Sequence, residues 1–128
     1  MQLSRDKQHF YITSNEEHFG EQHYYKLAPW GGTRTRLTKM TGSNQVVLSP
    51  DETKLAFLNS FSNRPWEIYL QENEVDNAPS QITKSQSRQF KEYKWREPEI
   101  ASFKAEDGET VYARLYENKT GEKAKNQP

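Results

Sequence analysis

One half of this chain repeats the other at an offset of 45 residues. Residues 3–6, Leu-Ser-Arg-Asp, return as residues 48–51, Leu-Ser-Pro-Asp. The same offset aligns apolar and turn positions along a whole unit: Phe10 with Leu55, Ile12 with Phe57, Tyr24 with Tyr69, Leu37 with Ile82 and Thr38 with Thr83. A repeat of this length, built from several short strands, is typical of propeller-type arrays rather than of helical solenoids. The sequence therefore predicts a structural array, with any chemistry lying elsewhere.

The composition is that of a folded, aromatic-rich β-protein with a thin core. Leu, Ile, Val and Phe number only 22 in 128 residues, a scarcity that would favour disorder if the net charge were also high. The net charge is zero, and 7 Tyr and 3 Trp add large apolar surfaces that suit pleated sheets. The absence of Cys excludes disulfides and thiolate metal sites. No segment has the apolar run that a membrane span or a signal peptide requires.

The second unit contains four predicted strands. Pro and Asp in the central positions of the turn at 49–52 favour a tight reversal. Residues 60–65 are expected to form a loop between the second and third strands. The predicted strands are 45–48, 54–58, 66–70 and a short one that ends at 82–83. Four strands in one repeat match the blade of a propeller.

The first unit follows the same plan with a shorter start. Its predicted middle strands are 9–14 and 22–27, and Gly31-Gly32 turns the chain into a last strand at 35–38. Only residues 1–3 remain for an innermost strand, so we expect the sequence to be part of a longer protein. The predicted divisions are a truncated blade at 1–40 and the last blade with a linker at 41–97.

The repeat stops after Thr83. A polar stretch follows, with a break at 96–99, and two further strands are predicted at 100–105 and 110–116. Asp107-Gly108 lies between them and favours a two-residue type I′ turn, which needs positive φ at both central residues. That turn would place Phe103 opposite Tyr112. We therefore predict a β-hairpin at 98–117 and a flexible tail at 118–128.

These motifs, in this order, resemble the prolyl oligopeptidase family of serine peptidases, and its dipeptidyl peptidase IV branch in particular. The similar features are Gly-Gly followed by Arg-Leu-Thr at 31–38, Ser-Pro-Asp at 49–51, Ser-Phe-Ser at 60–62 and Pro-Glu at 98–99. The hairpin at 103–116, Phe-Lys-Ala-x-Asp-Gly-x-x-Val-Tyr-Ala-x-Leu-Tyr, resembles the one that leads from the propeller into the α/β-hydrolase domain in that family. The resemblance implies an all-β partial β-propeller, with about two four-stranded antiparallel blades followed by a β-hairpin.

The resemblance also implies what the intact protein does. It would remove dipeptides with Pro or Ala in second position from peptide N-termini, and its propeller would restrict substrate access. A nucleophile elbow needs Gly-x-Ser-x-Gly, but no glycine of this chain stands two residues from a serine. We therefore expect no catalytic, cofactor-binding or metal residue here and no activity of this chain alone. Peptide substrates would belong to the intact enzyme, for which a bacterial periplasmic or secreted location is left open.

Several residues could be interpreted as parts of a functional site. The branch anchors the substrate's amino terminus with paired glutamates, but Glu16-Glu17 lacks the aromatic-rich insertion around that pair, so a solvated loop is favoured. His18 and His23 have no third ligand at a suitable spacing, which favours loop and strand-surface histidines over a metal site. Asp51 follows Pro in a turn, and such residues bond their own backbone more often than they act as catalytic acids.

The remaining alternatives concern partners. Five cations between Lys84 and Arg96 alternate with aromatic residues, but the zero net charge favours an edge strand and linker over a nucleic-acid surface. Trp66, Tyr69 and Tyr24 recur at strand spacing, which favours packing between blades over a binding face. A non-catalytic propeller scaffold is the alternative function, and the break after position 83 favours the peptidase. Fewer than three repeats leave apolar flanks and edges exposed, so we also expect self-association.

Overall fold

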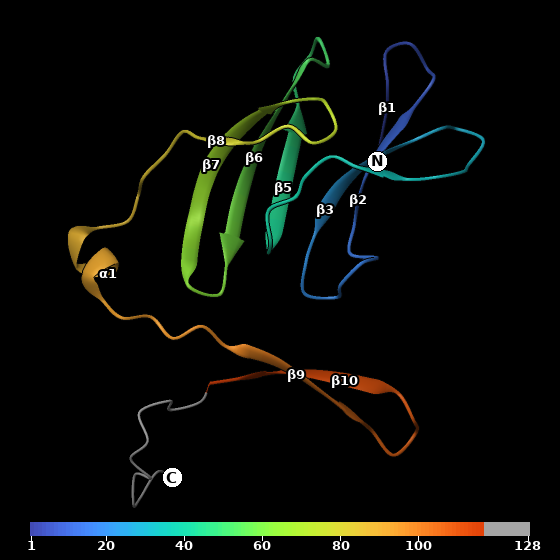
Figure 1. Cartoon of the computed structure of the whole chain (residues 1–128). Helices are drawn as coiled ribbons and strands as arrows, with labels where there is room; N and C mark the ends of the chain where they lie inside the picture. Colours follow the sequence, from blue (N-terminus) through green and yellow to red (C-terminus); the bar gives the residue numbers. More distant parts are fainter. Residues whose placement is uncertain (117–128) are drawn as a thin grey trace, which may run out of the picture. The chain divides into compact units, whose positions relative to one another are not determined.

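Residues 1–116 of the chain are described by a computed structural model and form mostly β-structure (Figure 1). Two four-stranded antiparallel sheets are followed by a two-stranded hairpin. The first sheet contains β1 (Gln2–Leu3), β2 (Phe10–Ser14), β3 (His23–Leu27) and β4 (Thr35–Arg36). The second contains β5 (Ser43–Leu48), β6 (Lys54–Phe61), β7 (Arg64–Glu72) and β8 (Ser80–Gln81). The prediction of a mostly β-protein with antiparallel sheets is confirmed, while the predicted tail at 118–128 lies outside the described residues.

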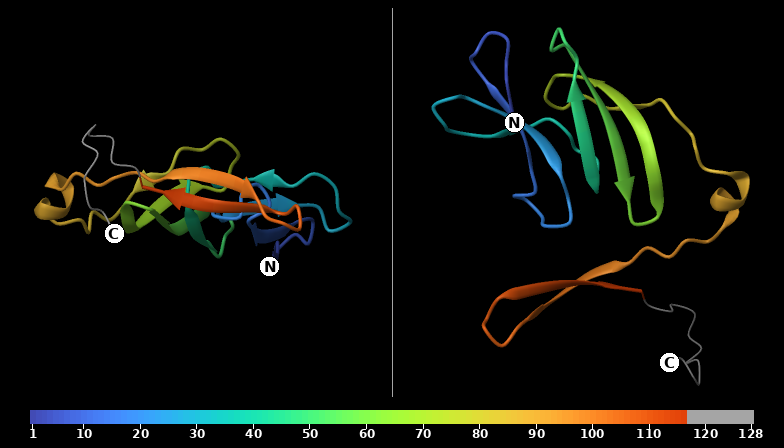
Figure 2. Two further views of the ribbon diagram at one scale, coloured as in Figure 1. Left: turned by 90° about the horizontal axis from the view of Figure 1, so that it is seen from below. Right: turned by 180° about the vertical axis from the view of Figure 1, so that it is seen from behind.

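The chain divides into two compact units, Met1–Glu92 and a second that begins at Tyr93. The first unit holds both four-stranded sheets, each with its strands in chain order, and a short helix, α1 (Arg88–Glu92). The two sheets lie side by side in this unit (Figure 2). The second unit holds the hairpin of β9 (Glu99–Lys104) and β10 (Thr110–Leu115).

The same turn precedes the second strand of both sheets. In each turn a serine hydroxyl donates to the carboxylate two residues later, at 2.5 Å from Ser4 to Asp6 and at 2.6 Å from Ser49 to Asp51. Each serine Oγ also accepts from the backbone N–H five residues later, at 2.9 Å in both sheets. The residue after each aspartate has a positive φ, 59° at Lys7 and 61° at Glu52. The serine bonds and the positive φ of these turns thus follow the 45-residue repeat.

The third strand of each sheet departs from the 45-residue offset by one position. Phe10 lies opposite Leu27 in the first sheet. Its counterpart Leu55 lies opposite Gln71, whereas a constant offset of 45 would place Glu72 there. The connection between the two middle strands is therefore one residue shorter in the second sheet. β3 corresponds to β7 at an offset of 44.

The fourth strand returns to the offset of 45. The backbone N–H of Leu37 donates to Tyr24 O, and that of Ile82 donates to Ile68 O, at 2.8 Å in both sheets. The equivalent positions are therefore Tyr24 with Ile68, Tyr25 with Tyr69, and Leu37 with Ile82. The prediction that Phe10 and Leu55, and likewise Tyr24 and Tyr69, lie in equivalent strands is confirmed. The alignment of Tyr24 itself with Tyr69 is wrong by one residue.

The loop predicted at 60–65 is mostly strand. β6 and β7 continue until Phe61 lies opposite Arg64, and the register shifts between Asn59 and Phe61. Only Ser62 and Asn63 remain to form the turn. The Arg64 guanidinium lies over the Phe61 ring, 5.5 Å from its centroid, and this contact helps to keep the two strands together at the tip.

The polar stretch after the second sheet contains a helical turn in place of the predicted edge strand. α1 buries none of its residues. The Ser87 hydroxyl accepts from the backbone N–H of Phe90 at 3.1 Å, and Arg88 forms an ion pair with Glu92 at 2.6 Å. A capping serine and an ion pair at a spacing of four residues are helix signals, which the prediction of an edge strand overlooked.

The hairpin has a different register from the predicted one. Phe103 lies opposite Val111 rather than Tyr112. Ala105 N–H donates to Glu109 O at 2.9 Å, so the loop has three residues, and among them only Gly108 has a positive φ, of 86°. A type I turn followed by a left-handed glycine has this form, whereas a type I′ turn needs two positive φ angles. The extra loop residue moves every pair by one position.

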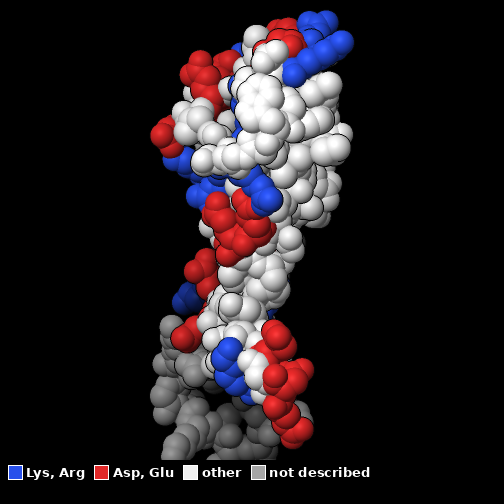
Figure 3. All heavy atoms as spheres, turned by 90° about the vertical axis from the view of Figure 1, so that its right-hand side faces the viewer, with Lys and Arg blue, Asp and Glu red and all other residues white. Residues whose placement is uncertain are grey.

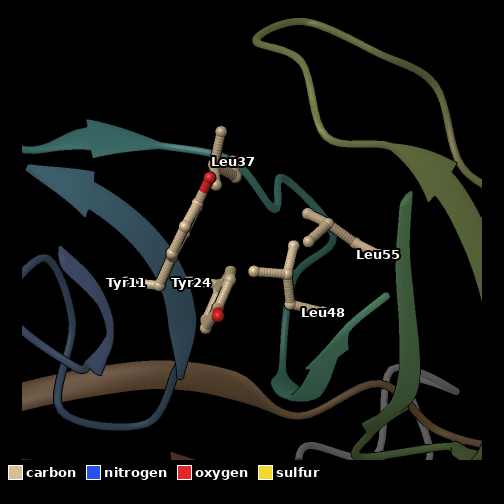
Figure 4. Packing of buried hydrophobic residues seen from close by; sticks show 5 residues of the cluster. All are labelled: Tyr11, Tyr24, Leu37, Leu48 and Leu55. Carbon is tan, nitrogen blue, oxygen red and sulfur yellow. The ribbon is translucent and has the colours of Figure 1, made fainter. Parts of the chain in front are cut away.

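The hydrophobic core lies between the two sheets of the first unit (Figure 4). The first sheet contributes two tyrosines whose rings stack at 5.7 Å, Tyr11 and Tyr24. The other members of the cluster are Leu37, Leu48 and Leu55. Each is at most 7% exposed, and burying a side chain of this size contributes about 1.5–3 kcal/mol. The same burial raises the pKa of the Tyr24 phenol to about 12.

Candidate functional site

Hydrogen bonds join the two sheets beside the hydrophobic core. The buried Gln71 amide donates to Leu37 O at 2.9 Å, and Asn73 donates to the Tyr11 hydroxyl at the same distance. Both donors come from the second sheet or its edge, and both acceptors from the first. Buried bonds of this kind contribute about 0.5–1.5 kcal/mol each and fix how the sheets meet. This contact is structural.

A buried polar cluster lies where the chain passes from the first sheet to the second. His23, Asn44 and Asn59 are at most 2% exposed. The Asn59 amide donates to Asn44 Oδ1 at 3.1 Å, while Asn44 Nδ2 donates to Met40 O at 2.8 Å and Gln22 O at 2.9 Å. These amides donate to backbone carbonyls just before β3 and in the segment between β4 and β5, where the chain crosses from one sheet to the other. The cluster therefore holds the sheets together at this end.

His23 is the histidine at the centre of this cluster, and its predicted place on a strand surface is wrong. Its Nε2 lies 2.9 Å from the Glu21 carboxylate, and its Nδ1 lies 3.4 Å from Thr38 Oγ1. An acid, an imidazole and a hydroxyl in this order have the outline of a hydrolytic triad. Thr38 is fully buried, however, and its Oγ1 already accepts from the Tyr24 N–H at 3.0 Å. No substrate reaches that hydroxyl.

The second sheet repeats this arrangement with a carboxylate in place of the imidazole. Thr83 Oγ1 accepts from Ile68 N–H at 2.8 Å, as Thr38 does from Tyr24. Its hydroxyl donates to Glu67, which occupies the position of His23. Ser85 adds two bonds of 2.7 Å to the same carboxylate, from its N–H and its hydroxyl. The Thr83 hydroxyl and these donors lower the pKa of Glu67, which therefore stays ionised as an acceptor.

The glutamates weighed as an amine anchor are paired within the first sheet. Glu16 forms an ion pair with Arg34, and Glu17 with Arg36. Glu17 also accepts from the Tyr25 hydroxyl at 3.2 Å. These pairs are partly exposed and contribute about 0–1 kcal/mol each. The two ion pairs tie the loop between β2 and β3 to β4 and to the residue that precedes it, which supports a structural role over a substrate anchor.

Asp51 closes its own turn, as predicted. Its Oδ1 accepts from the Ser49 hydroxyl, from Thr53 N–H at 3.2 Å and from the Thr53 hydroxyl at 3.0 Å. The Ser49 bond and the two Thr53 bonds hold the pKa of Asp51 at about 2. A carboxylate with so low a pKa is a poor general acid or base near neutral pH.

A cavity of about 470 Å³ opens beside the crossing between the sheets. Its lining side chains are apolar or neutral amides and one hydroxyl: Thr13, Gln22, Asn44, Gln45, Val46, Val47, Ala56, Phe57, Leu58 and Ile68. None of these lining residues titrates. The cavity therefore offers shape and hydrogen bonds, without a nucleophile or a proton donor that catalysis would require.

On the face shown in Figure 3, Lys and Arg lie interspersed with Asp and Glu. In the basic stretch, Arg88 pairs with Glu92, and the rings of Tyr93 and Trp95 contact each other at 4.6 Å. Among residues 1–116, no group of three or more His, Asp or Glu side chains is placed to hold a metal ion. No described helix is long and apolar enough to cross a membrane.

Within Met1–Glu92, the second sheet has one face that no other element of this unit covers. Its exposed apolar side chains come from β5, β6 and β7: Val47, Leu58, Trp66 and Ile68. We call this the open face. Trp66, predicted to pack between blades, is 44% exposed here, while Tyr24 does pack between the sheets. The sequence signal for the open face is the alternation in the middle of β6 and β7, where apolar residues also recur on the side away from the first sheet: Ala56, Leu58, Trp66, Ile68 and Leu70.

Comparison with models of known protein families finds none that matches this chain, and comparison with curated proteins finds none that matches either.

Proposed function

We propose that this chain is a structural part of a serine peptidase of the dipeptidyl peptidase IV branch of the prolyl oligopeptidase family. In this proposal the two sheets are the last blades of a β-propeller. The hairpin β9–β10 then opens the α/β-hydrolase domain. The intact enzyme would remove Xaa-Pro or Xaa-Ala dipeptides from peptide N-termini.

The observation that carries the proposal is the repeat and its interruption. The two sheets share the Ser-x-Asp turn, the strand order and the Thr38 and Thr83 contacts, and they pack face to face through a common core. Consecutive four-stranded antiparallel sheets stacked in this way are the building pattern of a propeller. A third unit would begin soon after Thr83, but α1 and the hairpin follow instead. That change of architecture supports a junction between two domains.

In this proposal the residues of this chain would have a structural role and would take no part in catalysis. The cavity beside the crossing has no titratable lining residue. The carboxylate of Asp51 accepts hydrogen bonds within its own turn, and that of Glu67 accepts hydrogen bonds from Ser85 after the last strand. Nothing among the described side chains supplies an activated nucleophile. In the intact enzyme the propeller would limit access to narrow, unstructured peptides, and catalysis would depend on the hydrolase domain.

A partner-binding propeller scaffold is the second candidate, and the open face favours it. An exposed apolar surface on a sheet is a frequent mark of a protein contact. The two candidates differ in the segment that comes after the hairpin. The peptidase requires Gly-x-Ser-x-Gly there, on a strand-to-helix turn, whereas the scaffold does not.

Two measurements test the proposal. Sequencing the gene beyond the codon for Pro128 should reveal Gly-x-Ser-x-Gly, and the encoded protein should cleave a chromogenic Ala-Pro substrate and be labelled by a fluorophosphonate. The 128-residue chain alone should show neither activity. A gene that continues without the motif would contradict the peptidase. Turnover by the short chain that is lost when one of its serines is replaced would do the same.

A further inference from the structure

The open face of the second sheet corresponds, through the internal repeat, to the face of the first sheet that is already buried. Ile68 occupies the position of Tyr24, and Ile82 that of Leu37. Tyr24 and Leu37 are 6% and 2% exposed in the core between the sheets. Ile68 and Ile82 are 41% and 59% exposed. The second sheet therefore presents an apolar surface of the kind that the first sheet buries.

The opposite face of the first sheet is the complementary surface. Leu3 lies opposite Phe10, as Leu48 lies opposite Leu55 in the second sheet. Leu48 and Leu55 are 7% and 0% exposed because they pack on the first sheet. Leu3 is 43% exposed and Phe10 is partly exposed, whereas Tyr25, two residues along the same face, is buried within the unit and donates to Glu17. The uncovered part of this face is therefore the end that holds Leu3 and Phe10. We call this side of the first sheet the rear face.

We propose that a second copy of this chain places its rear face on the open face, so that the contact between the two sheets of one chain is repeated between chains. The contact would continue an existing interface, because one molecule carries both of the surfaces that meet in it. The uncovered surfaces are apolar at the equivalent positions, Ile68 and Ile82 on the open face and Leu3 and Phe10 on the rear face. This inference goes beyond the peptidase assignment and concerns the 128-residue chain itself, because in the intact propeller proposed above neighbouring blades would occupy these two faces. Because the two surfaces differ, the contact is heterologous and continues from copy to copy into a ring or an open array.

The contact between copies is weaker than the one within the chain. The bond from Gln71 to Leu37 O has no equivalent, because Leu27 occupies the position of Gln71. Tyr11, the acceptor for Asn73, is replaced by Ala56. The contact between copies thus keeps the apolar part of the interface and loses both of these cross-sheet hydrogen bonds. Association should therefore rise with protein concentration and be insensitive to salt.

Complementary variants on the two faces test the proposal. Ile68→Lys places a charge on the open face, and Leu3→Lys places one on the rear face. In sedimentation velocity, the full chain should form species larger than a dimer as its concentration rises. Each variant alone should remain a monomer, because either change breaks every head-to-tail contact. An equimolar mixture should form dimers and nothing larger, since only one competent pair of faces remains.

Trp30→Lys is the matched control, because Trp30 is 79% exposed in the connection between β3 and β4. It should associate as the unmodified chain does. Circular dichroism and thermal melting confirm that each variant is folded. A chain that stays monomeric at all concentrations would overturn the proposal. A Leu3→Lys variant that still associates would also overturn it, because the contact would then join two open faces or involve the hairpin. A mixture of the two variants that fails to dimerise would contradict it as well.

Discussion

The two sheets of the first unit have the same local structure but different surroundings. Each has a Ser-x-Asp turn with the same two serine hydrogen bonds, and each ends with a threonine that accepts from the third strand. The face that contains Tyr24 is buried in the first sheet, and the face that contains Ile68 is open in the second. The comparison shows that the turn and the strand end are encoded within each unit. Burial, in contrast, depends on which neighbour is present.

The threonine that follows the fourth strand has one contact in common between the two sheets and one that differs. Thr38 and Thr83 contact the same backbone position, but their second partners are His23 and Glu67. An imidazole and a carboxylate can each bond a hydroxyl, so either satisfies the threonine. The backbone contact is therefore the common feature, and the second partner can differ.

The largest expected contrast is between equivalent aliphatic residues on the two faces. Leu37→Ala should lower the free energy of unfolding by about 2–5 kcal/mol, because it leaves a cavity in the core. Ile82→Ala, at the equivalent exposed position, should change it by about 0.5 kcal/mol or less. Urea denaturation at low protein concentration, monitored by tryptophan fluorescence, measures both. Equal losses would mean that the open face is covered in solution.

A second contrast concerns the crossing between the sheets. Gly42 has a φ of 106°, and a Cβ there would lie 2.1 Å from Ser60 O. Gly31 has a φ of 90°, and a Cβ at that position would meet nothing within 4 Å. Backbone strain of this kind costs about 1–3 kcal/mol, so Gly31→Ala should fall in that range. Gly42→Ala should cost more, as measured by urea denaturation. A Gly42→Ala chain as stable as Gly31→Ala would contradict the close approach.

The turns provide a comparison in which equal effects are expected. Ser4→Ala and Ser49→Ala each remove a hydroxyl that donates to an aspartate and accepts from a backbone N–H. Each should lower the free energy of unfolding by about 1 kcal/mol. Thermal melting of the two variants side by side is sufficient. A loss confined to one of them would show that the turns are not energetically equivalent.

The smallest expected effect is a dependence on pH. The pKa of Asp51 is about 2 in the folded chain, below its ordinary value of 3.8, chiefly through the Ser49 hydroxyl. A lowered folded-state pKa contributes stability above pH 3.8, and this stability is lost as the pH falls towards 2. Asp51→Asn should therefore melt with a flatter pH dependence between about pH 4 and 2. Asp107→Asn, in the hairpin loop, is a control. Parallel curves for the unmodified chain and Asp51→Asn would contradict the pKa shift.

The sequence predicted the strands and the repeat because turn chemistry and alternation are local signals. It missed the one-residue change of offset between β3 and β7, since Tyr24 and Tyr25 are adjacent and either aligns with Tyr69. Asp107-Gly108 likewise fits two loop lengths, and the predicted register assumed the shorter one. The burial of His23 depends on Asn44, which is distant in the sequence. Nothing in the pattern around either residue indicates that the two sheets enclose them.

The equivalence of the two sheets is tested most directly by nuclear Overhauser contacts between opposing strands. In the intact chain, Phe10 should show cross-strand backbone contacts with Leu27, and Leu55 with Gln71. The Ile68 and Tyr24 amides should both be protected from exchange by their threonine hydroxyls. Contacts between Leu55 and Glu72 would restore a constant offset of 45 and contradict the structural alignment. Loss of the β6–β7 contacts altogether would contradict the repeat itself.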